Sequence, residues 1–304
     1  MTTASFIAIA ALVIVVAGPM LLGLAGWFET RRASAGADRA IAWDWKLTIA
    51  SSLLYVLAFN LTFLIQELAL VLPKAFTPGL RPTLFHNNHS WDGTHPLAAL
   101  FQGTGALATL LTGVACAVLL RRGADKSVAR RLFLFWMAYS GVFMALPQVV
   151  IGALSDRSDV GIAMGYAELG TAGKTVAALL ALAAIPLAAV WIGKLLLTHV
   201  EGQQQATDAK GRKTFIFRSA TLPGMLALPM ILLFRVPREW TEVLLVPTVV
   251  TAVGLAWIQA GAWRVGAQAT GNGVAVDSIS RPLVAVLCLL LIFQVLLRPG
   301  IRFY

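Results

Sequence analysis

Long apolar runs separated by short polar segments make up almost the whole chain of 304 residues. A run of about 18 or more apolar residues is long enough to cross the hydrocarbon core of a bilayer as a helix. Backbone groups find no water there, so each run is expected to be helical. The pattern predicts eight spans, at residues 5–27, 47–72, 97–120, 132–154, 176–198, 219–235, 242–263 and 282–298. Proline removes a helical hydrogen bond, so Pro73 is expected to end the second span and Pro147 to break the fourth.

The segments between these runs leave little room for a separate soluble domain. The longest of them cover residues 73–96, 155–175 and 199–218. We therefore predict an all-α fold, a polytopic integral membrane helical bundle, in which residues 1–304 form a single transmembrane domain. Within the second segment, residues 160–170 are moderately apolar and predict a re-entrant or interfacial helix.

Composition supports this class, because 58% of the residues are hydrophobic and only 12% are charged, against about 25% in an average soluble domain. The net charge of +10 follows membrane topology rather than a nucleic-acid footprint. Cytoplasmic loops carry an excess of Lys and Arg, and 15 of the 24 basic residues fall in four alternate segments, 28–46, 121–131, 199–218 and 264–281. This predicts a lipid bilayer but no nucleic acid as partner, a bacterial inner (plasma) membrane location, and two extracytoplasmic termini.

Inside the second run stand the polar residues Asn60, Gln66 and Glu67, and Glu67 is the only acidic residue well inside any run. Asn60, Glu67 and Lys74 are spaced by seven and share one helix face, which we expect to point into the bundle. An ionisable residue within a span is a functional candidate. The alternative is a structural pair of Glu67 with Lys74 or with a histidine of the following loop.

That loop contains three of the four histidines, in the pattern His86-x-x-His89-x-x-Asp92-x-x-His95. Imidazole and carboxylate groups bind zinc or another divalent transition metal. On a straight α-helix the fourth side chain would point away from the first, so the prediction requires a 3₁₀ turn or a loop wrapped around the ion, and Gly93 and Pro96 favour the loop. Residues proposed to orient the ligands or to line a polar path beside them are Asn60, Gln66, Asn87, Asn88 and Gln102. The alternative interpretation is a polar network that caps helices and contacts headgroups.

The third run carries small residues at every fourth position, in particular Gly105, Thr109 and Gly113. Such rows let two helix backbones approach closely. The second and third spans are therefore expected to be neighbours, with the histidine loop across their outer ends.

Two of these segments resemble motifs of the site-2-type intramembrane zinc metalloproteases. Gln66-Glu67-x-x-Leu70 stands where that family has His-Glu-x-x-His, and the stretch from Gly105 to Gly113 stands where it has a later small-residue motif. Asp159 lies where the family has a further aspartate. The resemblance implies that Glu67 is the catalytic general base. Gln66 and Leu70 cannot replace imidazole as zinc ligands, so it also implies lost zinc, or ligands moved to the loop at 86–95.

Three functional hypotheses follow, and the sequence does not decide whether the chain is an enzyme. The first is a non-peptidase membrane subunit or pseudoenzyme that contacts membrane-protein partners and has a polar, metal-binding site at its extracytoplasmic face. The second is a metal-dependent membrane hydrolase that uses the loop ligands and Glu67. The third is a small-solute or ion transporter whose polar path would consist of Asn60, Gln66, Glu67, Gln102, Gln148 and Gln259.

Overall fold

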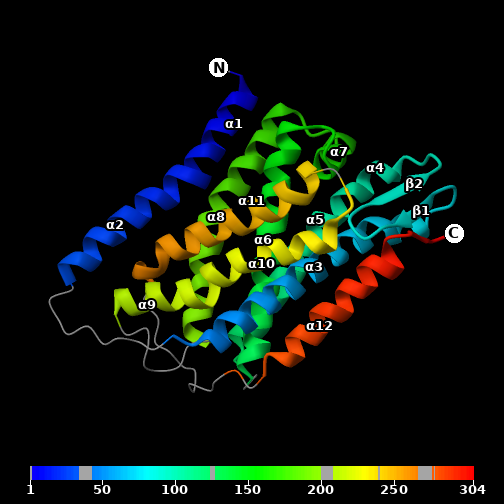
Figure 1. Ribbon diagram of the computed structural model, residues 1–304. Coiled ribbons are helices and arrows are strands. Elements are labelled where there is room, and N and C mark those ends of the chain that lie inside the picture. Colours follow the sequence, from blue (N-terminus) through cyan, green and yellow to red (C-terminus); the bar gives the residue numbers. More distant parts are fainter. Residues whose placement is uncertain are drawn as a thin grey trace.

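The structure, a computed structural model, describes residues 2–33, 43–123, 127–199, 208–238, 240–265, 276 and 278–304. Within them the chain is an all-α bundle with one small sheet at one end (Figure 1). Its α-helices are α1 Thr3–Leu12, α2 Gly18–Ala33, α3 Trp45–Ala75, α4 Leu97–Leu100, α5 Thr104–Arg121, α6 Val128–Leu154, α7 Asp159–Tyr166, α8 Thr171–His199, α9 Ala209–Ile216, α10 Leu222–Arg235, α11 Trp240–Gly261 and α12 Ser280–Leu291. Short π- or 3₁₀-helical segments extend several of them, at Val13–Ala17, Phe101–Gly103, Phe217–Thr221, Ala262–Arg264 and Ile292–Leu297.

Joined end to end, these elements form eight helices in the described residues that are long and apolar enough to cross a membrane. The predicted all-α, multi-pass architecture is thereby confirmed. The spans are Thr3–Arg31, Trp45–Ala75, Leu97–Arg121, Val128–Leu154, Thr171–Thr198, Ala209–Arg235, Val243–Arg264 and Ser280–Leu297. Most of the predicted loop 264–281, and parts of the loops 28–46, 121–131 and 199–218, lie outside the described residues.

The sixth span begins at Ala209, ten residues before the predicted start, so the end of the predicted loop 199–218 is helical. The side chain of Asp208 accepts a hydrogen bond from Gly211 N and caps this helix. Its first turns are too polar to register as part of an apolar run, which explains the error.

Pro73 lies inside the second span without ending it. The prediction that the helix stops there was wrong, because α3 continues to Ala75. Pro73 has no N–H for the carbonyl four residues before it, and Thr104 of α5 donates its hydroxyl to that carbonyl, Ala69 O, at 2.6 Å. The predicted break at Pro147 is also absent, since α6 runs through it. Within a membrane, neighbouring side chains that satisfy freed carbonyls make such prolines tolerable.

Near its start, α3 provides the same kind of donor for the sixth span. Pro223 cannot donate to Ser219 O, and Ser51 donates its hydroxyl to this carbonyl at 2.5 Å. The preceding carbonyl, Arg218 O, accepts a hydrogen bond from the hydroxyl of Thr48 at 3.0 Å. The small polar residues of α3 thus fix α10 and its π-helical extension in place.

Close packing joins α5 to α6 through the predicted small-residue row. A Cβ built on Gly141 of α6 would lie 2.6 Å from Gly113 Cα, so only glycine fits there. Gly105 packs against Leu70 and Gln66 of α3, where a Cβ would come within 3.0 Å of both side chains. The expected neighbourhood of the second and third spans is present, and the row serves contacts within this chain.

A small antiparallel sheet occupies part of the predicted loop 73–96, which was expected to be irregular. Strands β1 (Arg81–Leu84) and β2 (His89–Asp92) form a hairpin, and the C-terminal β3 (Ile301–Arg302) pairs with the other edge of β1, in the order β2-β1-β3. The register places Leu84 opposite His89 and Arg81 opposite Asp92. The hairpin lies at the end of the bundle where α3 ends, next to the C-terminus (Figure 1).

The short helix α7, which begins at Asp159, follows α6 as the moderately apolar stretch 160–170 predicted, although it ends at Tyr166. The Ser158 side chain caps it by accepting a hydrogen bond from Gly161 N at 3.2 Å. This cap fixes the start of α7, and Asp159 belongs to its first turn.

Candidate functional site

The carboxylate of Glu67 and the imidazole of His89 form a buried pair. His89 Nδ1 lies 2.9 Å from Glu67 Oε2, and the two side chains are only 7% and 6% exposed. Glu67 comes from the last third of α3, and His89 is the first residue of β2. The hairpin therefore closes over the end of α3, as the sequence predicted, and delivers one histidine to the buried acid.

Lys74 lies on the other side of the same imidazole. Its ammonium donates to a carbonyl of its own helix at 2.9 Å and to Gln102 Oε1 at 3.4 Å, and it lies 3.3 Å from His89 Nε2. An ammonium group has only donors, so we assign the lone pair to Nε2 and the proton to Nδ1, which then donates to Glu67. Trp91, two residues along β2, stacks on the His89 ring and lies 4.6 Å beneath the ammonium.

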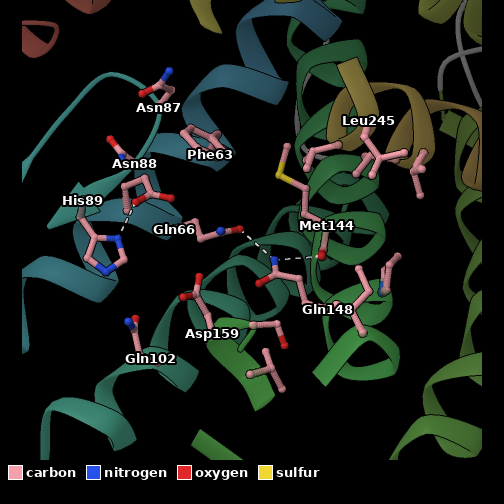
Figure 2. A pocket seen from close by; sticks show the side chains of 18 of the residues that line it. Phe63, Gln66, Asn87, Asn88, His89, Gln102, Met144, Gln148, Asp159 and Leu245 are labelled. Carbon is pink, nitrogen blue, oxygen red and sulfur yellow. Dashed lines mark hydrogen bonds and ion pairs between the residues drawn. The ribbon is translucent and has the colours of Figure 1, made fainter. Parts of the chain in front are cut away.

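Asp159 reaches the same cluster from α7. Burial raises the pKa of its carboxyl group, and the nearby Glu67 raises it further, whereas His89 and Lys74 act in the opposite direction. In Figure 2, Asp159 points toward the cavity beside Gln66. Two acids and two nitrogen bases thus meet at this end of the bundle.

Two glutamines link the spans next to the cluster. Gln148 of α6 donates from Nε2 to Gln66 Oε1 at 2.9 Å and to its own helix at Met144 O at 3.0 Å (Figure 2). This bridge holds the Gln66 side chain, next to Glu67, and links α3 to α6.

Arginines approach from the connection between α10 and α11. The guanidinium of Arg235 is buried and lies 4.4 Å from the centre of the Phe63 ring. Asn87, in the hairpin turn, donates to Arg235 O at 2.9 Å, and Arg238 donates to Asn87 O at 2.8 Å. These two hydrogen bonds link the hairpin turn to the connection between α10 and α11.

These groups surround a pocket of about 610 Å³, which is within the range of small-molecule sites. One wall is polar and the other is formed by apolar side chains of α6 and α11 (Figure 2). The polar lining residues are Gln66, Glu67, Asn87, Asn88, His89, Gln102, Gln148, Arg157, Ser158, Asp159, Arg235 and Arg238.

The four predicted metal ligands do not come together. Side chains alternate along a strand, so His89 faces Glu67 whereas Asp92 is exposed. His95 instead accepts a hydrogen bond from Leu97 N at 3.2 Å. The described residues contain no group of three or more His, Cys, Asp or Glu side chains placed to hold a metal ion. The prediction from residues three apart assumed a loop around the ion, whereas the segment forms a hairpin. A metal cofactor therefore stays a prediction, and the predicted ligands are not assembled around one point.

His86 is buried in the hairpin turn, apart from the pair. Burial lowers the pKa of its imidazole, the Val236 carbonyl opposes this shift, and three nearby guanidinium groups add to it. A neutral imidazole is therefore favoured at this position.

The remaining predicted residues divide into those that line the pocket and those that do not. Gln259 is among the latter, because it accepts from Thr221 at 2.6 Å and donates to Lys213 O at 3.2 Å. Gln66, Asn87, Asn88 and Gln102 line the pocket. Asn60 is buried, as its helix face predicted, but it donates to a carbonyl of its own helix and is not among the lining residues.

Sequence reasoning missed the contribution of Arg157, Arg235, Arg238 and Trp91. The three arginines were counted only as topology signals in loops. Their common position at one end of the bundle is the signal that could have drawn attention to them.

Comparisons with known proteins add no relative, since no family model, curated protein or solved structure matches this chain. The resemblance to site-2-type metalloproteases therefore stays a prediction.

Proposed function

We propose that this multi-pass membrane protein is a non-peptidase protein that binds a small ligand in the pocket at the hairpin end of its bundle. The observation that carries the proposal is the buried Glu67–His89 pair on the polar wall of that pocket. Pockets with an apolar lining and a few convergent polar groups are the usual sites for small ligands. On this proposal Glu67, held in place by the hydrogen bond from His89, binds a polar group of the ligand.

Binding has more support than hydrolysis. The hydrolase predicted from the sequence would need its four metal ligands around one ion, with Glu67 as general base toward the attacking water. The hairpin separates these ligands, because His89 bonds to Glu67, Asp92 is exposed and His95 accepts a hydrogen bond from Leu97 N. Among the described residues Glu67 therefore has no assembled ligand set beside it.

Transport has less support because the bundle is filled beyond the pocket. Tyr55, Phe59, Trp136 and Tyr139 pack together there and are 0% exposed. Tyr139 also donates to the carbonyls of α11 at 2.8 and 2.9 Å. A solute that followed the predicted polar path would have to displace this aromatic layer.

Native mass spectrometry of the gently extracted protein tests the proposal. We expect the wild type to retain a non-protein mass that is released on unfolding, and Val249→Trp, which fills the pocket, to lack it. Val114→Trp makes the same change on the exposed face of α5 and should retain it. Equal retention in the two tryptophan variants, or no retained mass in the wild type, would contradict the proposal.

A further inference from the structure

The apolar wall of the pocket continues onto the outer surface of the bundle. Ile151, near the end of α6, and Leu245 and Val246, near the start of α11, all line the pocket. They are nevertheless 49%, 60% and 40% exposed. Both helices are membrane spans, so these side chains form a mouth between α6 and α11 that faces lipid.

Positive charge gathers on the polar side of this mouth. Arg157 is exposed, and its guanidinium forms no hydrogen bond or ion pair with any described residue. Arg238 is half-buried and Arg235 is buried, and all three line the pocket. Of the two carboxylates of the lining, Glu67 is buried and accepts the hydrogen bond from His89, and Asp159 is half-buried. The Lys74 ammonium group lies on the far side of the His89 ring and offsets part of their negative charge.

We propose that the pocket takes the anionic headgroup of a membrane lipid, which enters between α6 and α11 while its acyl chains stay along the apolar mouth. This rests on the proposed function, since it names the ligand class of the same pocket. Guanidinium groups bind phosphate through paired, charge-assisted hydrogen bonds. Arg157 and Arg238 are placed to bind the phosphate, and the deeper polar groups contact the rest of the headgroup. The lipid-facing mouth favours a lipid over a soluble anion.

Photo-crosslinking in nanodiscs tests this proposal. Wild-type protein is reconstituted with phosphatidylglycerol or phosphatidylcholine that carries a diazirine in one acyl chain, and labelled peptides are mapped. We expect phosphatidylglycerol to label the peptides around Ile151 and Leu245 more strongly than phosphatidylcholine does. Arg157→Gln and Arg238→Gln should each reduce this labelling about fivefold, as expected for one basic side chain near an anionic lipid. Arg302→Gln, an exposed change on β3, should leave it unchanged.

The outcomes separate this inference from the proposed function. Equal labelling by both lipids that Val249→Trp abolishes would overturn the anionic ligand and leave a ligand pocket. Labelling that survives Val249→Trp, or Val246→Trp if the first variant does not fold, would show surface lipid only and overturn the inference. Competition by soluble glycerol phosphate, without chains, as strong as that by unlabelled phosphatidylglycerol would assign the site to a free anion instead.

Discussion

Thr104 Oγ1 of α5 lies 2.6 Å from Ala69 O of α3, the carbonyl that Pro73 leaves without its helical donor. The same hydroxyl is also 2.6 Å from Phe101 O, so one proton serves two acceptors. We expect Thr104→Val, which keeps the shape but removes the donor, to lower the free energy of unfolding by about 1 kcal/mol. Pro73→Ala restores an N–H and should reduce this loss. Thermal unfolding followed by tryptophan fluorescence measures both, and a loss of the same size in the Pro73→Ala background would contradict the explanation.

The Glu67–His89 pair should show energetic coupling. In a double-mutant cycle of Glu67→Gln and His89→Ala, we expect a coupling energy of about 1 kcal/mol, typical of the stronger polar contacts inside membrane bundles. A second cycle with His95→Ala is the matched control, because this histidine belongs to the same loop but bonds to Leu97 N. Additive effects in the first cycle, or equal coupling in both, would show that the pair does not act as a unit.

The contact between α5 and α6 should tolerate no side chain at Gly141. A Cβ there would lie 2.6 Å from Gly113 Cα, so Gly141→Ala must push two backbones apart, at a cost of about 1–3 kcal/mol or more. Gly165→Ala on α7 is the control, because nothing lies within 4 Å of its added Cβ. Unfolding temperatures of the two variants provide the comparison, and similar values would refute the close contact.

How far the sequence predicts this molecule depends on the range of the interactions involved. The eight spans and the buried face of Asn60, Glu67 and Lys74 follow from local pattern, because hydrophobic length and helical period act within one segment. The contact of Glu67 with His89 depends on the path of the loop. For this loop the sequence left open a metal site or a structural pair of Glu67 with Lys74 or a histidine. The hairpin selects one of them and separates the supposed metal ligands, because a strand has a period of two. The arginines join the site through tertiary packing, which no local pattern encodes.

Asp159 should make stability depend on pH. Its ordinary pKa is 3.8, and burial raises the pKa in the fold, so the folded state binds the proton more tightly than the unfolded state does. Its contribution is therefore fully present below pH 3.8 and is lost as the pH rises through the raised pKa. The groups that face it are Glu67, His89 and Lys74. As the pH rises from 3.8 through the raised pKa, we expect the unfolding temperature of the wild type to fall relative to that of Asp159→Asn. A constant difference between the two proteins would contradict the shift.

The orientation predicted from basic residues has a direct test. Eight spans would place both termini on one side, and the excess of Lys and Arg in the alternate loops predicts that this side faces away from the cytoplasm. We expect alkaline phosphatase fused after Tyr304 to be active, because its disulfides form only in an oxidising compartment, and a green fluorescent protein fused at the same point to be dark. A third fusion, between residues 199 and 208, ahead of the sixth span, should give the opposite pair of signals. Because the hairpin and its pocket lie at the same end as the C-terminus, this result would also place the ligand site outside the cytoplasm, whereas a bright C-terminal fluorescent fusion would place it inside.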